Sequence, residues 1–253
     1  MLAFIIRRVG QSLLVLLIVG LVAFSMFNFV GDPIDNMLGQ ERTAEDIARL
    51  REQLGLDRSF FVQYFRFLQE ALQGNFGVSY RQGRPVTDIL LERAPATLEL
   101  AAVSGVLAIL FGIALGVFTA IRRDGIWAHA IMSASLIGVS LPTFLIGILL
   151  IYVFSVELGW LPSFGRGDVV TVGGWKTGFL TESGLKALIL PSITLGLYQM
   201  TLIMRLVRSE MLEVLRQDYI RFARARGLRD RAVNFRHALK NTMLPVITVG
   251  GVQ

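Results

Sequence analysis

Hydrophobic positions in this chain form long unbroken runs rather than an alternating or helical stripe. Such runs occupy residues 9–30, 97–121, 126–156 and 187–204, and a further run begins at residue 241. The first has 22 residues without a charge and would extend about 33 Å as a helix, enough to cross the hydrocarbon core of a bilayer. The pattern predicts an all-α, polytopic membrane protein with five helical spans in these 253 residues. We expect the fifth span to continue beyond them and a sixth to follow.

A long polar segment separates the first two runs. It divides the chain into a first span (residues 1–30), an insertion (residues 31–96) and a core of further spans (residues 97–253). Capping residues and apolar spacing predict helices over residues 43–54, 60–72 and 86–94, and Gly74 marks the end of the second. We interpret the stripe along the second helix as a packing face, formed by Phe61, Tyr64, Phe65, Leu68 and Leu72.

Within the spans, a few residues break the apolar pattern. Glu99 lies near the outer end of the second run, where we expect it to reach lipid headgroups. Gly112 and Gly116 form a small-xxx-small pair, which allows two helices to approach closely. The third run is 31 residues long, more than a bilayer needs. Tilt, a kink at Pro142 or an interfacial start at Trp127 would accommodate the excess.

Charge gives the predicted orientation. Segments with an excess of arginine and lysine alternate along the chain with segments that lack one. In membrane proteins, the segments with the basic excess remain on the cytoplasmic side. This places the N-terminus, the turn after the second run and residues 205–240 on the cytoplasmic side of the membrane. The residues that define the first two of these are Arg7, Arg8, Arg122 and Arg123. A cleaved signal peptide is the alternative for the first run, but the run is too long and no small-x-small cleavage site follows.

Composition excludes several classes of protein. The chain is 53% hydrophobic and has no cysteine, which rules out disulfides, thiolate metal sites and a cysteine nucleophile. Its two histidines, His129 and His237, are too few and too far apart for a metal site. Basic residues cluster beside apolar spans, which indicates membrane sorting rather than nucleic-acid binding. No charged residue lies deep in a span, which disfavours an ion-coupled secondary transporter.

One outer segment superficially resembles a phosphate-binding loop. Residues 157–186 are rich in glycine and contain Gly173-Gly174-Trp175-Lys176-Thr177. The phosphate-loop pattern requires glycine directly before the lysine, where this chain has Trp175. We therefore predict no nucleotide site and no catalytic residue in this chain.

The most charged stretch, residues 205–245, reads as a pair of surface helices. It carries ten basic and four acidic residues. We expect Asp218 to cap a first helix that ends at Gly227, with Ile220, Ala223 and Gly227 on one face. Asp230 would cap a second helix, whose apolar face we expect to hold Ala232, Phe235 and Leu239. A basic rim around a small-residue face suits docking to an acidic partner, and a basic helix lying on anionic lipid is the alternative.

This stretch resembles the EAA loop of binding-protein-dependent ABC importer permeases. Gly227 matches the loop glycine and Ala223 the second alanine, while Arg221 and Phe222 replace the glutamate and the first alanine. Pro245 matches the later proline. The resemblance to the first, B-type permease of dipeptide, oligopeptide and nickel importers extends along the chain, through FIIRRVGQSL, GDPI, LGLDRSFFVQYFRFL, GNFGVSY, RAPATLELA, GVSLPTF and WLPSFG.

The resemblance implies a type I ABC importer architecture. The chain would lie in the lipid of a bacterial inner (plasma) membrane and pair there with a second permease. Its other partners would be ATP-binding subunits that hold ATP and Mg²⁺ and a periplasmic or lipid-anchored solute-binding protein. It would itself be no enzyme. Peptides are the implied substrates, with nickel chelates, glutathione or opines as alternatives. The residues implied to couple to the ATPase are Asp218, Ile220, Arg221, Phe222, Ala223, Arg224, Ala225 and Gly227.

Polar residues within the spans are candidates for the substrate path. They are Asn28, Ser140, Thr143, Tyr198, Gln199 and Thr201. Serine and threonine hydroxyls in spans also commonly bond to their own helix or to a neighbouring one, so packing is the competing interpretation for each.

Overall fold

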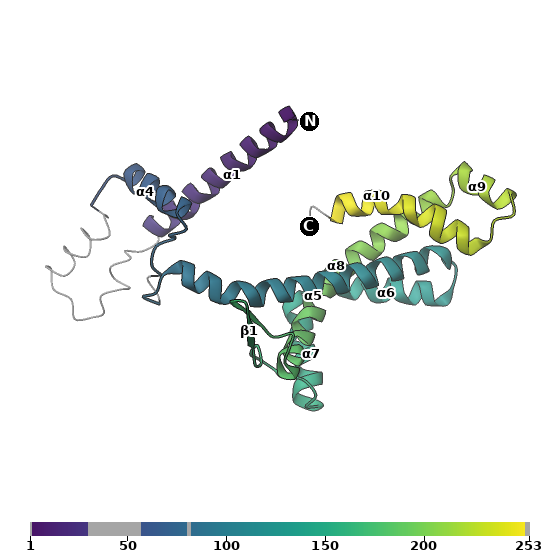
Figure 1. The fold of residues 1–253 in the computed structure, drawn as a ribbon. Coiled ribbons are helices and arrows are strands. Elements are labelled where there is room, and N and C mark those ends of the chain that lie inside the picture. Colours follow the sequence, from purple (N-terminus) through teal and green to yellow (C-terminus); the bar gives the residue numbers. More distant parts are fainter. Residues whose placement is uncertain (1, 30–56, 80–81, 251–253) are drawn as a thin grey trace. The chain divides into compact units, whose positions relative to one another are not determined.

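The computed structural model describes residues 2–29, 57–79 and 82–250 and divides into two compact units, residues 1–93 and 94–253. Both units are largely helical (Figure 1). The helix predicted over residues 43–54 lies outside the described residues. The elements are α1 (Leu2–Phe29), α4 (Phe60–Leu72), α5 (Val86–Ile121), α6 (Ile126–Ser140), α7 (Thr143–Ile151), the π-helix η1 (Tyr152–Glu157), β1 (Val170–Val172), β2 (Trp175–Thr177), α8 (Glu182–Val214), α9 (Asp218–Ala225), the π-helix η2 (Ala232–Ala238) and α10 (Leu239–Gly250).

Three helices in the described part of the chain, α1, α5 and α8, are long and apolar enough to cross a membrane. This confirms the first, second and fourth predicted spans, although α5 continues without interruption from residue 86 through Pro95. The third predicted span differs. It is broken into α6 and α7, which meet at an angle of 105°. The break follows from Pro142, which lacks an N–H group and holds Leu141 in an extended conformation (φ −87°, ψ 136°).

In the first unit, α4 packs on α1 through aromatic rings. The Phe24 ring lies 5.5–5.7 Å from those of Phe60, Tyr64 and Phe67. Tyr64 is 6% exposed, and its hydroxyl donates a hydrogen bond of 2.7 Å to the carbonyl oxygen of Leu17. The helix boundaries agree with the prediction, and so does the end at Gly74, where φ is +81°. The predicted packing face is only partly right, because Phe61, Phe65 and Leu72 are exposed.

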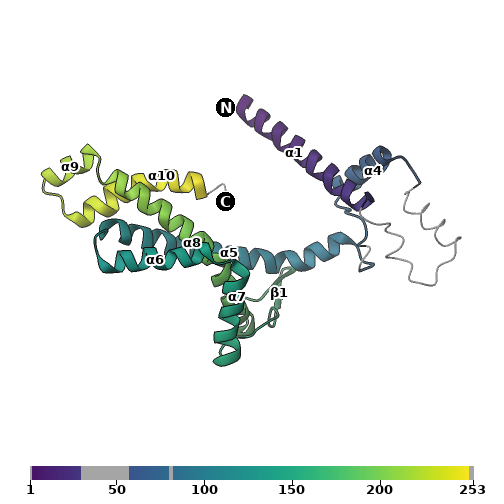
Figure 2. The same cartoon turned by 180° about the vertical axis from the view of Figure 1, so that it is seen from behind.

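In the second unit, α8 is the central helix. It contacts α6, α7 and α10, and it crosses α5 (Figures 1 and 2). At the crossing, a Cβ atom built on Gly116 would lie 2.7 Å from the Cβ of Val207 and 2.8 Å from the carbonyl oxygen of Met204. Gly112 approaches Ile203 in the same way, at 2.9 Å. The glycine pair therefore forms the close helix contact that the sequence predicts.

We expect Gly116→Ala to destabilise the protein by about 1–3 kcal/mol, because the added methyl overpacks the crossing of α5 and α8. Gly105→Ala, on the same helix, is the matched control, since a Cβ there meets nothing within 4 Å. Thermal unfolding of the purified protein measures both. Equal unfolding temperatures for the two variants would contradict a close contact between α5 and α8 at Gly116.

Candidate functional site

The candidate coupling site is built on α9. Gln217, in an extended conformation, precedes the helix as its N-cap. The prediction that Asp218 caps the helix is therefore wrong. Asp218 lies in the first turn, where its carboxylate is 3.4 Å from the guanidinium of Arg221. At the other end, the N–H of Leu228 donates to the carbonyl of Ala223, and the N–H of Gly227 donates to that of Arg224. These two bonds form a Schellman motif, which requires the positive φ of +77° that Gly227 adopts.

The inner face of α9 is buried against this chain. Ile220 is 0% exposed and Ala223 is 7% exposed. Both belong to a core that also contains Met211 of α8 and Val233 of η2. The sequence predicts a docking face formed by Ile220, Ala223 and Gly227. The protein's own helices cover the first two, whereas Gly227 is exposed.

The outer face of α9 is the surface that remains available. Phe222 is 64% exposed and Tyr219 44% exposed, and Arg221, Arg224 and Ala225 are exposed beside them. Next to this face lies an open hollow of about 590 Å³. The residues that line it are Ser209, Leu212, Glu213, Arg216, Gln217, Asp218 and Arg221. The site therefore offers a large aromatic side chain within a ring of basic groups.

The helices next to α9 differ from the prediction in two ways. The fourth span does not end at Met204, since α8 continues to Val214 into the charged stretch. After α9, a π-helical segment shifts the buried face, because the helix takes an extra residue in its turns. Val233 and Ala238 are consequently 0% exposed, whereas Phe235, expected on the apolar face, is 53% exposed. Asn241 on α10 donates a hydrogen bond to the Tyr219 hydroxyl (2.9 Å), which connects α10 to α9.

At the opposite end of α8, Glu99 is buried rather than directed toward headgroups. It is 3% exposed. Its carboxylate accepts hydrogen bonds from the guanidinium of Arg166 (3.0 Å), the indole N–H of Trp175 (3.2 Å) and the backbone N–H of Gly178 (3.3 Å). We call these four residues the Glu99 clasp. It fastens the segment between η1 and α8, including the β1–β2 hairpin, to α5.

The clasp continues into the start of α8. Thr181 caps the helix by accepting a hydrogen bond from the N–H of Gly184, and its hydroxyl donates to the carbonyl of Asp168. Ser183 donates to the carboxylate of Asp168 at 2.7 Å. The rejected phosphate-loop sequence forms the turn and second strand of the hairpin, with Val170 paired to Thr177. A single network of hydrogen bonds thus connects the clasp, the hairpin and the first turn of α8.

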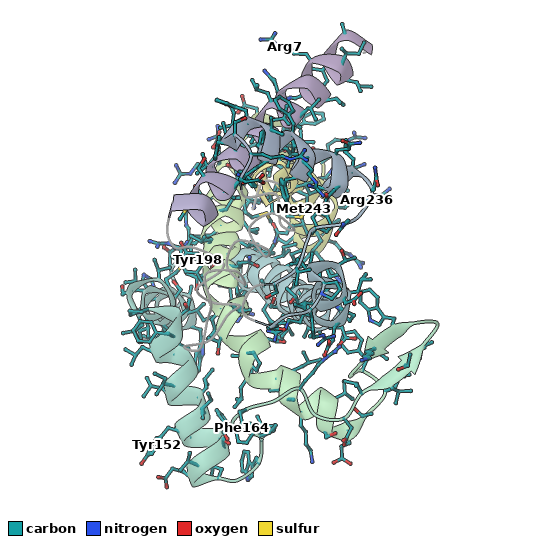
Figure 3. The ribbon with its side chains drawn as sticks, turned by 90° about the vertical axis from the view of Figure 1, so that its left-hand side faces the viewer. Arg7, Tyr152, Phe164, Tyr198, Arg236 and Met243 are labelled. Carbon is teal, nitrogen blue, oxygen red and sulfur yellow. The ribbon has the colours of Figure 1, made fainter. Side chains whose placement is uncertain are left out.

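The candidate path residues fall into two groups. Ser140 and Thr143 flank the break between α6 and α7 and are exposed. Contacts of Gly138 with Thr201 and of Gly147 with Thr194 place this break at the level of Tyr198 on α8. Tyr198 and Gln199 are also exposed, and Figure 3 shows Tyr198 part-way along α8, between Met243 of α10 and Phe164 of the loop that follows η1.

The remaining two path candidates lie elsewhere. Thr201 is 1% exposed, and its hydroxyl donates to the carbonyl of Leu197 in its own helix. Its side chain therefore packs between α8 and α6, where Gly138 approaches it. Asn28 lies in α1, in the other unit.

Comparison with known proteins identifies the family. A sequence family described as the inner membrane component of binding-protein-dependent transport systems matches residues 112–253, and the N-terminal part of such membrane components matches residues 1–101. The chain belongs to this permease family. The di/tripeptide transport system permease DppB of Pseudomonas aeruginosa is 40% identical over 267 residues, which cover all of this chain and 80% of DppB. The dipeptide permease DppB of Alkalihalophilus pseudofirmus is 36% identical and the glutathione permease GsiC of Salmonella paratyphi A 37% identical, with 80% and 78% of their lengths covered.

In this permease, α9 was predictable from the sequence, but the Glu99 clasp was not. The only signal was a single acid near the end of an apolar run together with a single arginine in a glycine-rich loop. Arg166 is separated from Glu99 by 67 residues and Gly178 by 79, so no local pattern joins them.

Gly227 provides a test of the α9 geometry in the permease. We expect Gly227→Val to destabilise the protein by about 1–3 kcal/mol, because a branched side chain is strained at positive φ. Gly227→Asn should lose much less, since asparagine tolerates this conformation. A Cβ at this position meets nothing within 4 Å, so side-chain crowding within the chain does not contribute. Thermal unfolding distinguishes the two, and equal losses would contradict the argument.

Proposed function

We propose that this chain is the membrane-spanning permease of an ATP-driven importer and forms part of the path for dipeptides and oligopeptides that a solute-binding protein delivers. The observation that carries the proposal is the match along the whole chain to permeases named for di- and tripeptide transport. Glutathione is the second candidate substrate, because a permease named for glutathione transport is nearly as similar. The chain binds no cofactor in this proposal, and ATP and Mg²⁺ bind to separate subunits.

We further propose that α9 docks on an ATP-binding subunit in the cytoplasm. The exposed Phe222 and the arginines around it support this role, since aromatic and arginine side chains dominate the energetics of protein interfaces. The same orientation places the N-terminus, with Arg7 and Arg8, in the cytoplasm. A second, different permease would complete the path.

The proposed mechanism transmits movement through α8. Ile220 and Ala223 fix α9 to α8 and α5, so a displacement of α9 moves these helices with it. With 33 residues, α8 extends about 50 Å from the coupling site to the Glu99 clasp. The break at Leu141–Pro142 interrupts the helical hydrogen bonds beside Tyr198 and is the natural place for the path to open.

Affinity purification from native membranes tests the proposed assembly. The expected companions, identified by mass spectrometry, are an ATP-binding subunit, a second permease of similar size and a solute-binding protein. A chain that purifies alone, or only as a homo-oligomer insensitive to ATP, would contradict it.

A further inference from the structure

The surface of α4 is divided into three faces. At about 100° per residue, Phe60, Tyr64 and Phe67 fall on one side, and these are the rings that meet Phe24 of α1. Gln69, Arg66 and Glu70 fall on a second, mainly polar side, which also holds the exposed Val62. Between the two lies an edge that is entirely apolar, formed by Phe61, Phe65, Leu68 and Leu72. We call these four residues the apolar edge of α4.

Among the described residues of the first unit, the apolar edge is left largely uncovered. Phe61 and Phe65 are each 66% exposed and Leu72 is 90% exposed. Three large side chains exposed in one row on a 13-residue helix form a continuous apolar surface, which marks an interaction site for protein or lipid.

The contacts with α1 place α4 at membrane depth. Phe24, which the three packing rings meet, lies five residues before the end of α1 at Phe29, about 8 Å along the helix. Leu17, whose carbonyl oxygen receives the Tyr64 hydrogen bond, lies twelve residues before that end, about 18 Å along the helix. Since α1 is long and apolar enough to span the bilayer, a helix that packs on this part of it lies at or below the headgroups.

The polar face of α4 is electrically balanced. Arg66 and Glu70 form an ion pair with an N···O distance of 3.0 Å, and both remain partly exposed to solvent. The face therefore suits contact with water and neutral headgroups and gives no net attraction to anionic lipid. Interfacial helices of this kind bury their apolar face about 5–10 Å into the boundary between headgroups and acyl chains, which agrees with the depth of Phe24. The hydroxyl at the tip of the Tyr64 side chain reaches deeper, to Leu17.

We propose that α4 lies in the membrane interface beside α1, with its apolar edge inserted among the acyl chains of the leaflet in which α1 ends. The three faces then have three surroundings: α1, acyl chains and water. We infer that the occupant is lipid, because α4 packs on a helix long and apolar enough to span the bilayer, and apolar side chains of that helix at the same level, Val22 and Met26, are exposed as well. In the orientation proposed above this is the outer leaflet, but the insertion itself does not depend on the transport function.

Site-directed spin labelling tests the insertion. Because the chain has no cysteine, single replacements can be made directly: Phe61→Cys and Phe65→Cys on the edge, with Arg66→Cys and Gln69→Cys as matched controls on the polar face. Each variant is purified with its partner subunits, spin-labelled and placed in vesicles of phosphatidylcholine alone. The unsubstituted complex provides the background from labels on partner subunits. Collision rates are measured with oxygen, which concentrates in acyl chains, and with a water-soluble nickel chelate.

We expect the ratio of oxygen to nickel collisions to be several-fold higher at positions 61 and 65 than at positions 66 and 69. High nickel accessibility at positions 61 and 65, in the absence of the solute-binding protein, would overturn the proposal in favour of a water-exposed docking surface. Low accessibility to both reagents would overturn it in favour of a protein partner. Failure of the importer assignment would change neither the ratio nor its interpretation.

Discussion

Phe222→Glu is expected to release the ATP-binding subunit while leaving the permease folded. Phe222 is the most exposed large apolar side chain of α9. Arg221, Arg224 and Arg226 lie near it in the sequence, and the guanidinium of Arg226 lies 5.7 Å from the centre of the Phe222 ring. Loss of such an aromatic anchor costs about 2 kcal/mol or more of binding, which corresponds to an affinity about 30-fold weaker. Binding of the purified ATP-binding subunit to the solubilised permease measures the effect directly.

Ile220→Ala is the control for this prediction. Ile220 is two residues away but fully buried, so its truncation should cost about 2–5 kcal/mol of folding stability. The unfolding temperature should therefore fall for Ile220→Ala and stay near the wild-type value for Phe222→Glu. Unchanged affinity in Phe222→Glu, or equal losses of stability in both variants, would contradict the division of α9 into a buried and a docking face.

Glu99→Ala is expected to have the largest effect on stability, about 3–5 kcal/mol. Removal of the carboxylate leaves the Arg166 guanidinium, which is only 27% exposed, without its counter-charge and with the Lys176 carbonyl as its remaining acceptor. The N–H groups of Trp175 and Gly178 lose the acceptor that they share with it. The segment from Arg166 to Gly178 should then exchange its amide hydrogens faster. Hydrogen exchange and thermal unfolding measure both consequences, and uptake should fall because the start of α8 loses its attachment to α5.

Glu182→Ala is the matched control for the clasp. Glu182 also forms an ion pair, with Lys186 at 2.7 Å, but it is 84% exposed. Exposed pairs of this kind are screened by water and contribute little to stability, so this variant should behave nearly as the wild type. If Glu99→Ala and Glu182→Ala lost equally little, the clasp would have no structural role.

Local features of this fold were predictable from the sequence. The boundaries of α4 follow from helical spacing and the glycine beyond it, and the end of α9 follows from Gly227. The close crossing of α5 and α8 follows from Gly112 and Gly116. Pro142 marked a kink in the third run, but the sequence did not predict the angle of 105° at which the two helices meet.

Features that depend on distant residues were not predictable. Glu99 appeared to be an interfacial acid because its partners lie more than sixty residues away. Ile220 and Ala223 appeared to be free for docking because nothing local shows that α8 and η2 cover them. No local pattern marks η2 as π-helical. The prediction assumed regular α-helical spacing and therefore placed Phe235 on the buried face, where Val233 and Ala238 lie instead. The burial of Thr201 also depends on the packing of α8, which its position in the sequence does not reveal.

Uptake of a labelled dipeptide into vesicles tests the central claim most directly. The permease is reconstituted with its co-purified subunits, ATP is enclosed in the vesicle lumen, and the solute-binding protein is added outside. The account predicts accumulation that requires both ATP and the binding protein and is lost in Phe222→Glu. Accumulation driven by a proton or sodium gradient without ATP would contradict it and would identify the chain as a different class of transporter.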